Sequence, residues 1–134
     1  MEARDQFLTD FRGPTLGSIQ PNSSADEIFQ NATLRPILKL QNNLFIAVFK
    51  NYIAKSKVEF AQLSVEKKLQ FIEHSIQRDI KFRNALKGMV IALFTEAEFE
   101  SYIKNSSALN KRMMGMLIER LKNQVQLFDL QTAF

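Results

Sequence analysis

The sequence predicts an all-α fold, an irregular bundle of five or six helices preceded by an extended N-terminal arm. Three observations predict it. Residues 36–57 are apolar on nearly every side of a helix. The chain of 134 residues has only 4 Gly and 3 Pro, and most of these lie between Gly13 and Pro36, which leaves room for long helices elsewhere. No segment alternates apolar and polar residues with the β-branched enrichment of a strand.

The length fits one domain, and the hydrophobic content of 46% is enough for a core and argues against disorder. We divide the chain into an N-terminal arm, residues 1–22, and a single helical domain, residues 23–134. Residues 1–33 carry a net charge of −3 and residues 34–134 a net charge of +7, which together give +4. Charge complementarity could therefore hold the arm against the domain.

The arm itself divides in two. Residues 3–11 predict a short helix with Phe7 and Phe11 on one side. Residues 12–22 contain two Gly and two Pro, which break any regular pattern and indicate an extended segment. Because this segment carries Leu16 and Ile19, which need apolar cover, we expect it to be docked on the domain or on another subunit.

Two short polar sequences mark the next helix starts. Ser23 or Ser24 is a suitable N-cap for a helix that ends near Ala32, since acids follow in the first turn. Thr33 is then expected to cap a second helix that carries Pro36 in its first turn, where a missing N–H costs little.

That second helix, residues 36–57, has more apolar surface than the stripe of a surface helix. Its apolar residues are Ile37, Leu38, Leu40, Leu44, Phe45, Ala47, Val48, Phe49, Tyr52 and Ile53. Such a helix must be surrounded, either by other helices of this chain or by a second copy of it.

Residues 64–94 form the next helical region, begun by Ser64 as N-cap. Its apolar stripe continues for longer than a typical helix, so we expect a kink or break near residues 78–81 or at Gly88. Asp79 precedes Arg83 by four residues, the favourable order for a surface ion pair. Arg83 also falls on the apolar stripe, so its guanidinium either pairs with a carboxylate or amide, or lines a pocket.

The clearest local signal is Thr95, with Glu98 three residues later, which predicts a capping box. The helix that follows is short and is expected to end at Asn105 in a left-handed conformation. Its three alternating glutamates, Glu96, Glu98 and Glu100, are interpreted as a solvated first turn. A last helix, residues 107–128, carries an apolar face that includes Leu109, Met113, Leu117, Leu121, Val125 and Phe128.

Residues 95–122 have the proportions of a helix-turn-helix motif. In such motifs the first residues of the second helix contact base edges, and Asn110, Lys111 and Arg112 are suitable side chains. Against this interpretation, the turn lacks the frequent glycine, and any helical hairpin has similar proportions.

The sequence lacks the residues that most catalytic and metal sites need. There is no cysteine and only one histidine, His74, so we expect no catalytic residues, no metal site and no cofactor. No apolar run is long enough for a membrane span, and the acidic start lacks the apolar core of a signal peptide. A cytoplasmic location is the expectation.

Three segments, Thr33–Asn42, Lys81–Gly88 and Ser107–Met114, together resemble a family of small all-helical bacterial proteins of unknown function. The resemblance covers roughly residues 29–128. Some relatives bear a glyoxalase label, but glyoxalase I-like enzymes resemble paired βαβββ modules with His and Glu metal ligands. With one histidine and no strand signal here, no catalytic residue is transferred from that label.

The first functional hypothesis is a homodimeric interaction or scaffold protein, based on the excess apolar helix surface. The second is a nucleic-acid-binding regulator that uses Asn110, Lys111 and Arg112. The third is a helical bundle that binds a small acidic or apolar ligand near Arg35 or Arg83. Convergence of Arg35, Arg83 and Asn110 on one cavity would favour a binding or catalytic site.

Overall fold

The computed structural model describes residues 2–129 and confirms the all-α class, with no strand in that range. Its eight α-helical segments exceed the predicted five or six helices, because two predicted helices are divided. The segments are α1 (Ala3–Arg12), α2 (Ala25–Phe29), α3 (Arg35–Leu40), α4 (Asn42–Ser56), α5 (Val65–Arg78), α6 (Ile80–Ile91), α7 (Glu96–Ile103) and α8 (Ser106–Lys122).

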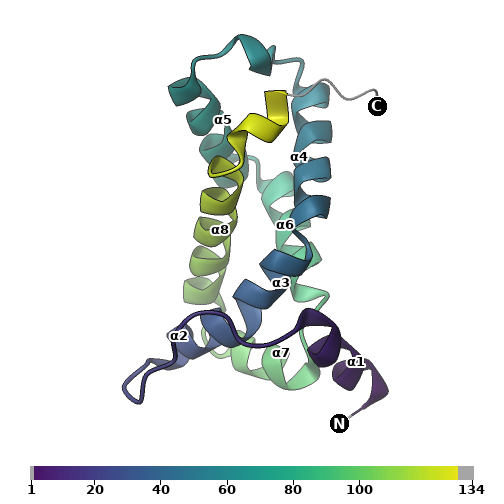
Figure 1. The fold of residues 1–134 in the computed structure, drawn as a ribbon, viewed down its shortest axis with the longest axis vertical. Coiled ribbons are helices and arrows are strands. Elements are labelled where there is room, and N and C mark those ends of the chain that lie inside the picture. Colours follow the sequence, from purple (N-terminus) through teal and green to yellow (C-terminus); the bar gives the residue numbers. More distant parts are fainter. Residues whose placement is uncertain (1, 130–134) are drawn as a thin grey trace.

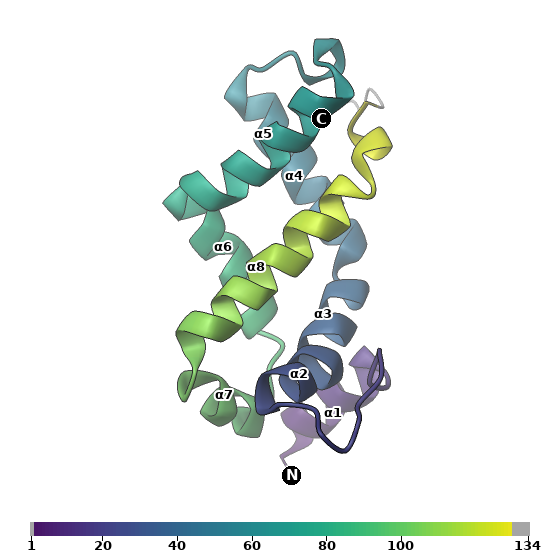
Figure 2. The same ribbon diagram turned by 90° about the vertical axis from the view of Figure 1, so that its left-hand side faces the viewer.

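The long helices run lengthwise, and the short helices α1, α2 and α7 close one end of the molecule (Figure 1). Helix α8 crosses the middle, with α5 and α6 on one side and α3 on the other (Figure 2). Its inward side chains Met113, Leu117 and Leu121 are at most 1% exposed, so α8 is the central element of the core. Burial of such side chains is the main source of stability in a domain of this size.

Helix α2 continues into α3 through a π-helical segment, Gln30–Leu34, so the expected N-cap at Thr33 is wrong. The N–H of Arg35 donates to the carbonyl of Gln30, five residues earlier. Pro36 explains the wider turn, because its ring would clash with the carbonyl four residues before it in a regular helix. Thr33 therefore lies inside a helix, with its hydroxyl available for a contact elsewhere.

The predicted single helix over residues 36–57 is bent at Gln41, which separates α3 from α4 and has φ −87° and ψ 2°. The backbone hydrogen bonds of Gln41 to Ile37 and Phe45 remain, so this is a kink rather than a loop. Next to it, the amides of Asn42 and Gln124 exchange two hydrogen bonds of 2.9 and 2.8 Å. This pair holds the kink against the end of α8.

The apolar surface of α3 and α4 is sheltered mainly by the chain's own helices. Ile37, Leu38, Phe45 and Phe49 are all 0–1% exposed. Leu44, at 48% exposed, faces outward. A second copy of the chain is therefore not needed to bury most of this surface.

The predicted break in residues 64–94 is confirmed at Asp79, between α5 and α6. The Asp79 carboxylate caps α6 by accepting from the N–H of Phe82, and it also accepts from the Tyr52 hydroxyl at 3.0 Å. The expected ion pair with Arg83 is wrong, since it is not among the ion pairs of the described residues. The cap uses the carboxylate that the ion pair would have needed.

The C-terminal helix is shorter than predicted. Helix α8 ends at Lys122, and a 3₁₀ turn, Val125–Asp129, follows it and buries Phe128. Residues 130–134, the end of the predicted helical domain, lie outside the described residues.

Gly88 lies within α6, where a glycine lowers helix stability and a larger residue could replace it. A Cβ built there meets nothing within 4 Å. Gly88→Ala is expected to raise the free energy of unfolding by about 0.5–1 kcal/mol, because alanine loses less backbone entropy in a helix. Urea unfolding measures this change. Gly17→Ala is the contrasting variant and should destabilise, since Gly17 has φ +89° and a Cβ there would lie 3.1 Å from Asn31.

Candidate functional site

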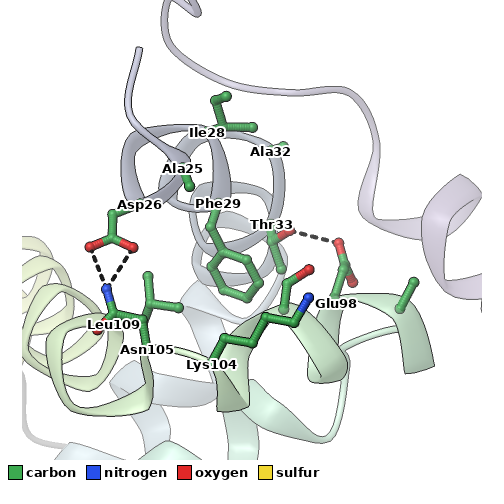
Figure 3. A pocket seen from close by; sticks show the side chains of 12 residues that line it. Ala25, Asp26, Ile28, Phe29, Ala32, Thr33, Glu98, Lys104, Asn105 and Leu109 are labelled. Carbon is green, nitrogen blue, oxygen red and sulfur yellow. Dashed lines mark hydrogen bonds between the residues drawn. The ribbon is translucent and has the colours of Figure 1, made fainter.

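A cavity of about 560 Å³ opens between α2 with its π-helical extension and α7 with the start of α8 (Figure 3). We call it the α2–α7 cavity. Its volume lies within the roughly 300–1,000 Å³ of small-molecule sites. It is lined by Ala25, Asp26, Ile28, Phe29, Ala32, Thr33, Ala97, Glu98, Ser101, Lys104, Asn105 and Leu109.

Most of the cavity surface is apolar. The Phe29 ring and Leu109 form its floor and are 8% and 2% exposed (Figure 3). Ala25, Ala32 and Ala97 line the sides, and their small side chains keep the cavity open. A large apolar surface with few polar groups binds a ligand mainly by excluding water from its apolar part.

One end of the cavity is formed by Glu98, whose two oxygens are fully engaged. Arg12 donates to both oxygens, at 2.6 and 2.7 Å. The Thr33 hydroxyl donates to Oε2 at 2.7 Å, and the Thr95 N–H donates to Oε1 at 2.8 Å. The capping box predicted at Thr95 is thus confirmed, but the interpretation of Glu98 as a solvated residue is wrong.

These contacts keep Glu98 ionised. Burial raises the pKa of Glu98, but the hydrogen bonds from Arg12, Thr95 and Thr33 and the charge of Arg12 lower it by more, so its pKa lies below the ordinary 4.5. A carboxylate with a lowered pKa and four accepted hydrogen bonds is a poor general base. Glu98 is therefore better suited to holding the cavity together than to moving protons.

The other end of the cavity is closed by a second polar pair. The Asn105 amide donates to both carboxylate oxygens of Asp26, at 3.0 and 2.9 Å (Figure 3). Asn105 has φ −148°, so the expected left-handed conformation is wrong. Lys104 extends along the cavity in the same view, and within residues 2–129 its ammonium forms no ion pair or hydrogen bond. Lys104 is thus the charged group with unused binding capacity.

Helix α1 is hydrogen-bonded to the end of α6 and the start of α7. The sequence did not predict these contacts. Arg4 donates to the carbonyls of Ala92 and Phe94, and Arg12 donates to the carbonyl of Leu93. The buried Asp5 accepts from the N–H of Glu96 at the start of α7. Helix α1 thereby satisfies backbone groups at the end of α6 and the start of α7. These four hydrogen bonds, three of them donated by arginines, dock α1, so the net negative charge of the arm is not what holds it. In the extended segment that follows, Ile19 is 44% exposed and lacks the expected apolar cover.

Two of the three residues proposed for nucleic-acid contacts are engaged within the chain. The Asn110 side chain accepts from the Tyr102 hydroxyl at 2.6 Å, and Arg112 donates to Gln30 at 2.8 Å. Lys111 is exposed. Helix α7 lies across the end of the molecule whereas α8 runs lengthwise (Figure 1), and base contacts by Asn110 or Arg112 would require these bonds to break. Nucleic-acid binding stays a prediction.

The structure does not bring Arg35, Arg83 and Asn110 into one cavity. Arg35 donates to Asn31 at 2.8 Å and lies near Arg120 in a hollow of about 220 Å³. Burial and the charge of Arg35 lower the pKa of Arg120. Arg83 instead shares a separate cavity with Lys111, so two of the residues selected from the sequence do meet.

Within the described range, no group of three or more His, Asp or Glu side chains is placed to hold a metal ion. None of the helices in residues 2–129 combines the length and apolar character of a membrane span. No family model, curated protein or solved structure matches the chain.

Proposed function

We propose that this protein is a non-catalytic binding protein that takes up a small apolar ligand with an acidic head group in the α2–α7 cavity. One observation carries the proposal: the apolar cavity has two carboxylates that are already hydrogen-bonded and one lysine, Lys104, that has no partner among residues 2–129.

The apolar part of the ligand would lie against Phe29 and Leu109 and gain about 25 cal/mol for each Å² of apolar surface removed from water. Its acidic head would pair with Lys104 at the cavity mouth. An exposed pair of this kind contributes roughly 0.2–1 kcal/mol, so the ion pair orients the ligand while burial supplies most of the affinity.

The scaffold hypothesis is retained as a weaker alternative. Its physical basis was the apolar surface of residues 36–57, and Phe45 and Phe49 on that surface are buried inside the chain. Self-association, a cytoplasmic location and the resemblance to small bacterial helical proteins stay predictions.

Blocking the cavity is expected to weaken ligand binding. Ser101 lies on the exposed face of α7 that lines the cavity, so Ser101→Leu adds a side chain there without touching the core. The probe is decanoate, measured by isothermal titration calorimetry. We expect Ser101→Leu to weaken decanoate binding by about tenfold or more, equivalent to ~1.4 kcal/mol. Asn84→Leu, an exposed polar-to-leucine change on α6, is the matched control and should bind like the unmodified chain.

Removing the Lys104 charge tests the head group separately. Lys104→Gln should weaken decanoate binding roughly two- to fivefold and leave the binding of decan-1-ol unchanged, because an exposed ion pair is worth roughly 0.2–1 kcal/mol. Lys55→Gln makes the same change of net charge on α4 and should alter neither affinity. Failure of both decanoate and decanol to bind the unmodified chain would disprove the proposed function.

A further inference from the structure

A second cavity, of about 520 Å³, lies where the end of α5 and the start of α6 meet α8. We call it the Arg83 cavity. It is lined by Gln77, Arg83, Ser107, Lys111, Met114, Gly115 and Ile118. It shares no lining residue with the α2–α7 cavity, so it is a separate site.

Arg83 is the unusual group in this cavity. Its Nε atom is buried and has no hydrogen-bond partner in the described part of the chain. None of the side-chain hydrogen bonds or ion pairs between residues 2 and 129 involves its guanidinium. A buried donor without a partner is unfavourable, and more so when it is charged. A ligand that accepts from this guanidinium would recover that cost.

The charges around Arg83 favour a dianion. Lys111 lines the same cavity and, in the range that the structure describes, also forms no ion pair. No carboxylate is among the lining residues, and the nearby Asp79 is occupied by Phe82 and Tyr52. The two positive charges of Arg83 and Lys111 match the two negative charges of a phosphate monoester. The planar guanidinium can also donate to two phosphate oxygens at once.

The apolar lining indicates that the ligand carries more than a phosphate group. Met114 and Ile118 are 4% and 6% exposed and give the cavity an apolar floor. A Cβ built on Gly115 meets nothing within 4 Å, so space remains above that floor. We propose that the Arg83 cavity binds the phosphate monoester of a small organic molecule. The phosphate lies between Arg83 and Lys111, and the organic part packs on Met114 and Ile118.

Phenyl phosphate is the probe, titrated by calorimetry into the full chain at low ionic strength. Arg83→Gln should weaken its binding by about tenfold, because Arg83 is partly buried and its charge-assisted contact is strong. Lys111→Gln should weaken it by roughly two- to fivefold, because Lys111 is exposed to solvent. Lys55→Gln, which makes the same change of net charge outside the cavity, should stay within twofold. Equal affinity in all four proteins, or no binding by the unmodified chain at millimolar probe, would overturn the proposal.

Two further comparisons separate the chemistry from effects on folding. Gly115→Leu should block phenyl phosphate and Gly115→Ala should not, while both chains fold because the position is exposed. Benzoate, with one charge, should bind more weakly than phenyl phosphate, and equal binding would contradict the phosphate assignment. Decanoate binding should be unaffected by Arg83→Gln, so failure at this site is distinguishable from failure of the α2–α7 cavity.

Discussion

Replacing Glu98 with alanine is expected to lower the free energy of unfolding by about 2–4 kcal/mol. Removing one partner of a buried ion pair leaves the other charge uncompensated, which costs about 3–5 kcal/mol when both are fully buried. The Arg12 side chain is only 4% exposed and that of Glu98 is 19% exposed, so the cost should fall slightly below that range. The variant also loses the bond from Thr33 and one half of the capping box of α7.

Urea unfolding followed by circular dichroism measures this loss. Glu100→Ala, an exposed change on the same helix, is the control and should cost less than about 0.5 kcal/mol. Arg12→Met together with Glu98→Ala should cost much less than the sum of the two single changes, because the pair acts as a unit. Additive losses would show that the Arg12–Glu98 contact contributes little.

The same carboxylate makes stability depend on pH. Because its pKa in the folded chain lies below the ordinary 4.5, its contribution is fully present above that value and is lost as the pH falls below it. The stability difference between the unmodified chain and Glu98→Gln should therefore be constant near neutral pH and shrink below about pH 4.5.

Phe49→Ala is expected to have the largest effect on the core, about 3–5 kcal/mol. The Phe49 ring is 1% exposed and lies 5.1–6.2 Å, between ring centroids, from four other rings. These belong to Tyr52, Phe71, Phe82 and Phe128. The substitution removes those contacts and leaves a cavity that α4, α5, α6 and the 3₁₀ turn must all close.

Thermal and urea unfolding should show this effect directly. Phe7→Ala is the matched control, because Phe7 is 63% exposed and, among residues 2–129, its ring stacks only on Phe11. Its loss should cost less than about 1 kcal/mol. If Phe49→Ala were as mild as Phe7→Ala, Phe49 could not be the centre of the aromatic core.

Local signals predicted the helix starts well. Ser24, Ser64 and Thr95 each accept from a backbone N–H three residues later, as their sequences indicated. A break near residues 78–81 was also predicted, as one of two places, because the apolar stripe continues for longer than a typical helix. These features depend on a few adjacent residues, and a sequence shows such residues directly.

Features that depend on distant partners could not be predicted. Thr33 resembles an N-cap, but the structure places it within a continuous helix facing Glu98, 65 residues later. The kink at Gln41 is held by the amide pair between Asn42 and Gln124, which are 82 residues apart. Glu98 resembled a solvated acid because the sequence does not show that Arg12 lies beside it.

The candidate sites were foreseen in part. Arg83 was singled out because a guanidinium on an apolar stripe needs a partner, and it does line a cavity. The α2–α7 cavity was missed, because its walls are alanines and a serine, which have no distinctive sequence signal. Such a cavity forms where the facing side chains of two helices are too small to fill the space between them. A sequence does not show which side chains face each other.

The docking of α1 has a consequence for how the chain acquires its structure during synthesis. Helix α1 is synthesised before α6 and α7, and every backbone group of these two segments that it satisfies belongs to residues made more than eighty positions later. Helix α1 therefore cannot dock until the chain has been synthesised as far as Glu98. Closing so long a loop is slow, so this end of the molecule should be the last to become ordered.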